Sequence, residues 1–259
     1  MAEIVLPEHI SVSQVRTWLD CQRRWYFRYV CGLKIPPPGA VVVGSAVHQA
    51  LRHTNVTLRD TERLPPLEEV MDVYAQAFEA EAPDALWRDE DPAKAKDGGY
   101  AGVRAYYERH AQDYRPVDVE HEVRVPLRGV GVDLVGVVDL RTPERIVDYK
   151  TTGRKPSEVP PEVAAQIWLY QYGYRELGVE ISGGEAVYIV TNTKSADVVK
   201  LPIPSPTPSD VARWMRVLAD ARRAMELAVE HELFLPAPPG AWYCSPEACG
   251  FWDVCHREF

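Results

Sequence analysis

The sequence predicts an α/β protein in which helices flank a mixed central sheet. Two observations support this fold class. The hydropathy pattern changes from a helical period to strict alternation at about residue 117, and three successive strands are then followed by a helix and a further strand. Hydrophobic residues also make up 46% of the 259 residues, so the chain can bury the core of one domain or of two small ones.

Helices are predicted through most of the first third of the chain. Ser11 or Ser13 can cap a helix that continues to Tyr29, and the PPPG run at residues 36–39 then interrupts the chain. A second helix is expected to begin at Gly44 and Ser45. Further helices are expected at residues 67–82 and 100–114, with a polar, Asp-rich loop between them.

Alternating segments predict three successive strands at residues 121–127, 132–140 and 145–152. Pro160 and Pro161 begin a helix that should continue to Gly178. Two further strands are expected at residues 185–192 and 197–203, followed by a long helix at residues 209–233.

Charge and hydropathy exclude several classes of protein. The net charge of -9 argues against a protein that coats nucleic acid non-specifically, because that requires a surplus of Lys and Arg. The sequence has no apolar run of the ~20 residues that a membrane span needs, and it does not begin like a signal peptide. These features predict a cytoplasmic protein without a membrane partner, whose five cysteines are reduced thiols or metal ligands.

One segment departs from the acidic average. Between residues 14 and 34, Arg23, Arg24 and Arg28 alternate with aromatic residues, and such a segment can contact DNA phosphates and stack on bases. An amphipathic helix with buried aromatics and solvated arginines explains the pattern equally well.

Two aspartates are predicted to face each other across a hairpin. If Pro143 and Glu144 form the turn, paired residues have numbers that sum to 287, which places Asp139 opposite Asp148. Like charges at that separation destabilise a sheet unless something offsets them, and carboxylates are preferred ligands of Mg²⁺ and Mn²⁺. Lys150 shares the face of Asp148, whereas Tyr149 points away. The combination suits phosphodiester hydrolysis, although a surface hairpin with an Asp–Lys pair remains the alternative.

Four short segments, in this order, resemble motifs of the PD-(D/E)XK nuclease superfamily, specifically of its RecB-like branch. The segments are GSAVH with His48, GVVDL with Asp139, DYKTT with Asp148, Tyr149 and Lys150, and QIWLY with Gln166 and Tyr170. The resemblance implies a single domain over residues 1–259, with a restriction-endonuclease-like core at about residues 117–203. It also implies that Mg²⁺ or Mn²⁺ is the metal cofactor, and Mn²⁺ suits a site that contains an imidazole.

The resemblance also assigns roles to individual residues. Lys150 is implied to be the catalytic lysine, with Gln166 and Tyr170 close to the hairpin. The implied metal ligands are His48, Asp139, Asp148 and the carbonyl of Tyr149. Alternatives remain for three residues: His48 and Tyr170 can be core residues, and Glu122 can be either a carboxylate behind the ligands or part of a solvated strand face.

The cysteines resemble those of an iron–sulfur subgroup of RecB-like nucleases, which includes the AddB nuclease domain and CRISPR-associated RecB-like exonucleases. Cys21 corresponds to one early ligand of a 4Fe-4S cluster, and Cys244, Cys249 and Cys255 to three late ligands, so that the cluster joins the N-terminal and C-terminal segments. The four residues between Cys244 and Cys249 depart from the usual two. A Cys₄ zinc site is the alternative. Cys31 is expected to be a buried thiol.

The expected function is that of a metal-dependent DNA nuclease in DNA processing, recombination or repair. Exonuclease activity on single strands or DNA ends is expected rather than endonuclease activity. The sequence has no Gly-x-x-x-x-Gly-Lys-(Ser/Thr) loop, so a motor activity would come from a helicase or recombination partner. Two alternatives are a non-catalytic DNA-binding or assembly subunit that retains the fold, and a zinc-stabilised structural protein.

Overall fold

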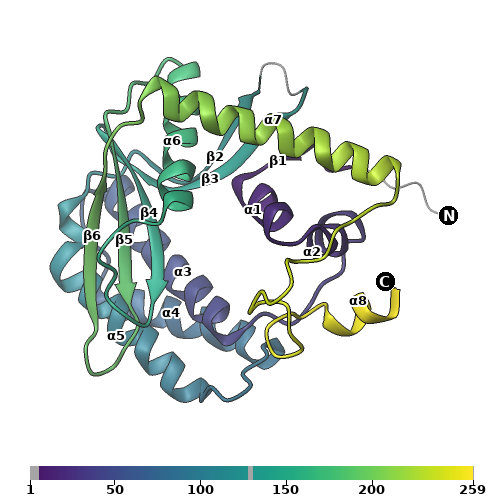
Figure 1. The fold of residues 1–259 in the computed structure, drawn as a ribbon. Coiled ribbons are helices and arrows are strands. Elements are labelled where there is room, and N and C mark those ends of the chain that lie inside the picture. Colours follow the sequence, from purple (N-terminus) through teal and green to yellow (C-terminus); the bar gives the residue numbers. More distant parts are fainter. Residues whose placement is uncertain (1–5, 128–130, 259) are drawn as a thin grey trace. The chain divides into compact units, whose positions relative to one another are not determined.

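The computed structural model describes residues 6–127 and 131–258, and the chain forms two compact units (Figure 1). Residues 37–123 and 137–206 make up the first, here called the core unit. Residues 1–36, 124–136 and 207–259 make up the second, the terminal unit. Within the described residues, no helix is both long and apolar enough to cross a membrane.

A mixed sheet forms the centre of the core unit. Strand β4 (Arg145–Thr152) pairs antiparallel with β3 (Asp133–Arg141) and parallel with β5 (Gly183–Val190), and β6 (Asp197–Ile203) pairs antiparallel with β5. Strand β2 (Asp118–Pro126) also pairs with β3. Helix α6 (Pro161–Glu176) provides the crossover that the parallel β4–β5 pair requires. The predicted mixed sheet is therefore confirmed.

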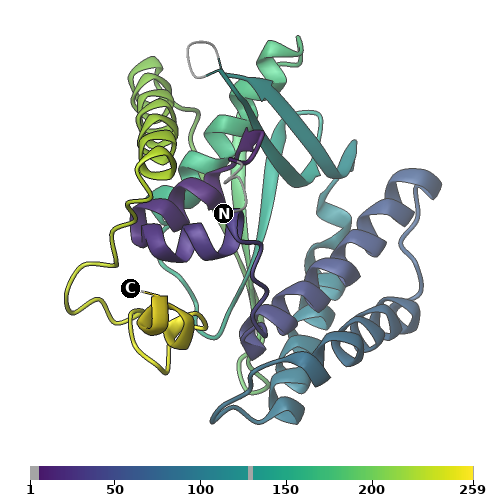
Figure 2. The ribbon, with the colours of Figure 1, turned by 90° about the vertical axis from the view of Figure 1, so that its right-hand side faces the viewer.

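Three helices cover one face of this sheet, and α6 lies on the other face (Figure 2). They are α3 (Gly39–Thr61), α4 (Leu67–Glu81) and α5 (Pro92–His110). Their apolar residues bury a continuous cluster with alternate residues of the strands, including Val147, Tyr149, Val187 and Ile189. Successive strand residues point to opposite faces, so Asp148 points away from this cluster.

Helix α5 approaches the end of β5 closely because it carries glycine at the contact. A Cβ at Gly98 would lie 2.6 Å from the backbone oxygen of Thr191, and one at Gly102 would lie 2.7 Å from Cγ2 of Ile189. The sequence prediction began this helix at residue 100, because Gly98 and Gly99 read as loop residues. The helix in fact begins at Pro92, where the Asp91 side chain caps it.

The N-terminal part of the terminal unit differs from the single helix predicted for residues 11–29. Ser11 caps α1 as expected, but α1 (Val12–Asp20) ends where Cys21 adopts an extended conformation with φ of -162°. A short α2 (Gln22–Trp25) and a π-helix (Tyr26–Val30) follow, and the Cys21 sulfur accepts a hydrogen bond from the backbone N–H of Arg24. Cys21 thus ends one helix and begins the next.

The C-terminal part of the terminal unit packs on these short helices. Tyr26 stacks on Phe234, and Phe27 stacks on Phe251, with ring centroids 4.3 and 5.7 Å apart. The long helix α7 (Pro208–Glu230) begins with a capping box of Thr207 and Asp210, and a short α8 (Trp252–Glu258) ends the described chain. Strand β1 (His9–Ile10) pairs parallel with the start of β3. Aromatic stacking therefore joins segments from both ends of the sequence.

Candidate active site

Strands β3 and β4 have the predicted register. Leu140 pairs with Val147, and Arg141 with Ile146, so the numbers of each pair sum to 287. Next to these pairs, the Oδ2 atom of Asp139 accepts a hydrogen bond from the backbone N–H of Tyr149 at 2.7 Å. The Asp139 side chain therefore bonds directly to the backbone of β4. The two aspartates of the predicted hairpin are thus held next to each other.

Asp148 is a buried carboxylate, 4% exposed, on the sheet face that carries Lys150. Lys150 Nζ donates a hydrogen bond to Oδ1 at 2.8 Å and lies 2.6 Å from Oδ2. Gln166 Nε2, on α6, donates to Oδ1 at 3.3 Å. The buried Asp148 carboxylate is therefore charge-paired with Lys150 through both of its oxygens.

Gln166 also donates a hydrogen bond to the Tyr170 hydroxyl at 3.2 Å, which confirms that both side chains lie on one face of α6. Tyr170 is 6% exposed, and burial is the main cause that raises its pKa to about 12. The Tyr170 hydroxyl therefore stays protonated near neutral pH, and it supports Gln166 beside Asp148.

The site strongly perturbs the protonation of the Asp139 carboxyl. Burial, and next the charge of Asp148, raise the pKa of Asp139 to about 7, against the opposing effects of Lys150 and the Tyr149 N–H. Like charges in a buried site disfavour ionisation, and a bound cation favours it. The electrostatics thus fit the predicted need for a positive charge between Asp139 and Asp148.

His48 projects from α3 towards these carboxylates. Its Nδ1 lies 3.6 Å from Oδ1 of Asp139. Burial and, after it, Lys150 lower the pKa of His48, although Glu120, Asp148 and the Tyr149 backbone act in the opposite direction. A lowered pKa favours the neutral imidazole, which is the form that ligates metals.

Glu120 is the residue that sequence reasoning missed. Its Oε1 lies 4.0 Å from His48 Nδ1, and the ligand atoms of His48, Glu120 and Asp139 all lie within 4.8 Å of one another. Glu120 has φ of 47°, a left-handed conformation within β2, and Glu122 beyond it is exposed. In a regular strand, Glu120 and Glu122 would lie on the same face, so the sequence alone could not say which of them is near His48. The left-handed backbone at Glu120 distinguishes the two in the structure.

These groups fit a divalent cation. Oxygen and nitrogen ligands at ~2.1 Å from an ion stand roughly 3 Å apart when adjacent, so the observed separations require only small side-chain movements. The donor set of one imidazole and several carboxylates suits Mn²⁺ as well as Mg²⁺. Compared with the predicted ligands, the structure adds Glu120 next to His48 and Asp139.

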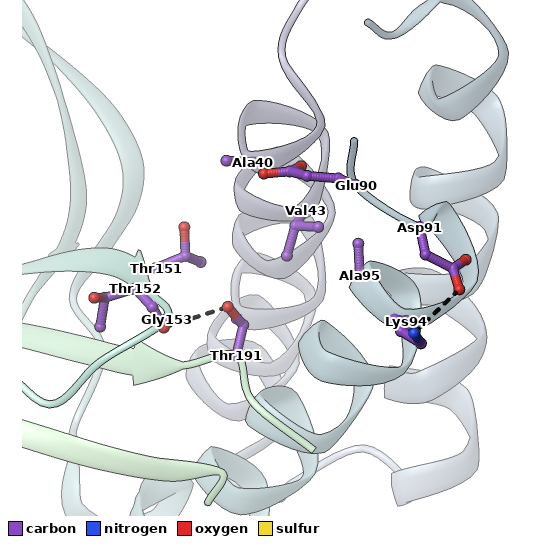
Figure 3. A pocket seen from close by; sticks show the side chains of 10 residues that line it. All are labelled: Ala40, Val43, Glu90, Asp91, Lys94, Ala95, Thr151, Thr152, Gly153 and Thr191. Carbon is purple, nitrogen blue, oxygen red and sulfur yellow. Dashed lines mark hydrogen bonds and ion pairs between the residues drawn. The ribbon is translucent and has the colours of Figure 1, made fainter. Parts of the chain in front are cut away.

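A pocket of about 390 Å³ lies in the core unit beyond the end of β4 (Figure 3). Thr151, Thr152 and Gly153, which directly follow Lys150, form part of its lining. The N-terminal turns of α3 and α5, the residues before α5, and Thr191 after β5 supply the rest, including Glu90 and Lys94. The surface of the core unit is therefore hollowed at the end of β4, immediately after Lys150.

The arginines predicted to bind DNA lie in the terminal unit, where two of them make structural contacts. Arg23 donates hydrogen bonds to the backbone oxygen of Phe234 and to the sulfur of Cys255. Arg24 forms an ion pair with Asp20 at 2.9 Å and lies over the ring of Tyr243. Arg28 lies over the ring of Tyr29. Their predicted contact with DNA stays a prediction.

The four cysteines of the predicted cluster also lie in the terminal unit. Burial, and after it the neighbouring Cys21 and Cys244, raise the pKa of Cys249, while Arg23 contacts the sulfur of Cys255. In the described part of the chain, no three of these thiols come as close together as the His48 group does. Cys31 is exposed, so its expected burial is wrong. It directly follows the π-helix, which ends at Val30.

Known proteins resemble this chain in fold and in sequence family. A candidate exonuclease from Eubacterium rectale has a similar fold, with a TM-score of 0.61 over 97% of this chain and 88% of its own, at 14% identity. A second solved structure, SSO0001, matches with 13% identity over 99% of this chain and 89% of its own, but its TM-score of 0.42 supports no structural argument. Among curated proteins, none matches the sequence. The model of one family matches residues 9–256, and the chain therefore belongs to the PD-(D/E)XK nuclease superfamily.

Proposed function

We propose that this protein is a divalent-metal-dependent deoxyribonuclease that acts as an exonuclease on single strands or DNA ends. The observation that carries the proposal is the group of His48, Glu120 and Asp139, whose ligand atoms all lie within 4.8 Å of one another, next to the buried Asp148–Lys150 pair. Family membership supports nuclease chemistry, and the similar fold of a candidate exonuclease supports action at ends. DNA processing, recombination or repair, with a helicase or recombination partner, is the context that we propose.

His48, Glu120, Asp139 and Asp148 would hold the cation, and the Tyr149 carbonyl is a further candidate ligand. A bound divalent ion lowers the pKa of a ligated water and polarises the phosphoryl oxygen. Lys150 can then orient the attacking water or stabilise the charge that develops on the phosphate. Gln166 keeps the Asp148 carboxylate in place through its hydrogen bond to Oδ1, and the Tyr170 hydroxyl supports Gln166.

Glu120 provides a sharp test, because the same strand carries a matched control. The variant Glu120→Gln keeps the size of the side chain but removes a charge next to His48, so we expect the Mn²⁺-dependent cleavage of end-labelled single-stranded DNA to fall about 10- to 100-fold, as is typical when a metal site is impaired. Glu122→Gln, on the exposed part of β2, should cleave at the wild-type rate. Equal activity of the two variants would remove Glu120 from the ligand set.

The wild-type protein tests the function itself in the same assay. Cleavage that depends on Mn²⁺ or Mg²⁺ and stops with chelator is the expected result. The pattern of labelled products distinguishes stepwise removal of nucleotides from internal cuts. A wild-type protein that binds DNA but cleaves none of it would instead favour the second candidate, a non-catalytic DNA-binding or assembly subunit.

We further propose that Cys21, Cys244, Cys249 and Cys255 hold a 4Fe-4S cluster, with zinc as the alternative metal. Support comes from the proximity of Cys21 and Cys244 to Cys249 and from the aromatic stacking that joins the early and late segments. The thiolates would be the ligands, and the cluster would restrict the unfolded chain over most of its length.

Cys31 makes a matched control for this cluster. We expect anaerobically purified wild-type protein and Cys31→Ser to be brown with visible absorbance, because Cys31 is exposed and outside the ligand set. Cys21→Ser should lose the colour and unfold at a lower temperature. A colourless wild-type protein with stoichiometric zinc would contradict the iron–sulfur assignment and support a zinc-stabilised terminal unit.

A further inference from the structure

We propose that the side chain of Tyr149, anchored by Asn55 and Tyr106, is a positioning element that sets the affinity of the candidate centre for its divalent cation. This inference rests on the proposed function. The Tyr149 hydroxyl accepts a hydrogen bond from Asn55 Nδ2 at 3.0 Å and lies 2.7 Å from the Tyr106 hydroxyl. All three side chains are at most 2% exposed, and they come from β4, α3 and α5. One buried polar cluster thus joins three elements of the core unit.

Tyr149 contacts the candidate centre at its other end. Its backbone N–H donates to Oδ2 of Asp139 at 2.7 Å, which fixes the orientation of that carboxylate. Its ring meets the ring of His48 edge-on, with centroids 6.3 Å apart and planes at 86°. The residue is therefore tied to two of the candidate ligands through separate contacts.

The spacing of residues on α3 makes the anchor effective. His48 and Asn55 are seven residues apart, which is close to two helical turns, so both point from the same face of α3 towards Tyr149. The helix is thus held at Asn55 by the hydroxyl of the same residue whose ring packs on His48. A small shift of α3 relative to β4 would move the imidazole away from Asp139, and the buried cluster opposes such a shift.

A purely structural role accounts less well for Asn55. Its side chain is fully buried, yet no described residue makes a hydrogen bond with its Oδ1. A buried polar atom without a partner is costly, and an apolar residue at this place on α3 would avoid that cost. The hydrogen bond from Asn55 to Tyr149 is what an apolar residue could not provide, and that bond links α3 to β4.

The test compares two buried tyrosines of the same apolar cluster. Tyr149→Phe removes the anchored hydroxyl but keeps the ring and the backbone contacts. Tyr74→Phe is the control, because its hydroxyl is also part-buried and donates to the backbone oxygen of Lys96, away from the candidate ligands. Mn²⁺ affinity is measured by titration calorimetry in the absence of DNA, and thermal unfolding is recorded for each variant.

We expect Tyr149→Phe to weaken Mn²⁺ binding by about 10-fold or more, in the range found when groups behind the metal ligands are removed. Tyr106→Phe should weaken it less, because the bond between Asn55 and Tyr149 remains, and this variant also covers the case in which Tyr149→Phe does not fold. Tyr74→Phe should lower stability but leave Mn²⁺ affinity unchanged.

The outcomes separate the inference from the function on which it rests. If wild-type protein binds Mn²⁺ and Tyr149→Phe and Tyr106→Phe bind it equally well, with only stability reduced as in Tyr74→Phe, the positioning role is overturned while the nuclease proposal stands. If wild-type protein binds no Mn²⁺ and cleaves no DNA, both proposals fail together.

Discussion

Replacing Lys150 with Ala is expected to lower the rate of DNA cleavage by about 10³-fold, the loss that follows removal of one preorganised donor from a catalytic site. Lys150 is the cation beside the buried Asp148, and it remains partly exposed towards the surface where a phosphate can reach it. The measurement is single-turnover cleavage of labelled single-stranded DNA with Mn²⁺. DNA binding without turnover should change little, because one of many phosphate contacts is lost.

Lys155 supplies the control for this prediction. It is an exposed lysine five positions further along the chain, and it pairs with Asp197 rather than with the candidate ligands. Lys155→Ala should cleave DNA at the wild-type rate. A fully active Lys150→Ala would contradict the assigned role. Lys150→Ala leaves the Asp148 carboxylate buried without its partner and should lower stability. The double variant Lys150→Ala/Asp148→Asn removes both charges, so it should be more stable than Lys150→Ala but equally inactive.

Adding one methyl group to Gly98 is expected to lower the stability of the core unit, because the new Cβ would meet backbone rather than a side chain. The new Cβ would lie 2.6 Å from the backbone oxygen of Thr191, which cannot rotate away. Overpacking of this kind costs roughly 1–3 kcal/mol, against a gain of about 1 kcal/mol from the better helix propensity of Ala. We expect Gly98→Ala to lower the free energy of unfolding by up to about 2 kcal/mol and the midpoint by as much as a few degrees.

The control for this substitution is Gly44→Ala in α3. Its Cβ would meet the hydroxyl of Thr151 at 3.2 Å, a side-chain atom that can move. The gain in helix propensity should then balance or exceed the small contact cost. Thermal unfolding of both variants would decide the matter. A Gly98→Ala protein as stable as Gly44→Ala would show that α5 can move away from β5 without penalty.

The strands could be predicted from the sequence because alternation and turn residues are local signals. The hairpin register followed from Pro143 and Glu144 alone, and the structure reproduces it at Leu140 and Val147. Helix α5 was shortened in the prediction because its glycines read as a loop, whereas they allow close packing on β5. Local propensity does not reveal such a contact with a distant strand.

The candidate site was predictable where its residues lie on regular elements and share a motif. His48, Asp148, Lys150 and Gln166 all lie where the segments placed them. The place of Glu120 in the candidate site was not predicted, because it depends on a left-handed backbone conformation that a Glu rarely adopts. The break between α1 and α2 was not predicted for a similar reason, because nothing in the sequence near Cys21 indicates its extended conformation.

The parallel pairing of β4 with β5 also has a consequence for the order of folding. It places Asp148 opposite Ala186, 38 positions later in the chain (148 to 186), so the strand that carries the carboxylate and the lysine is held by a distant partner. Parallel pairing across such a sequence separation is slow compared with the local pairing of a hairpin. During refolding, the β3–β4 hairpin should therefore form before its acidic groups acquire their final surroundings, and competence for hydrolysis should appear only when the crossover through α6 is complete.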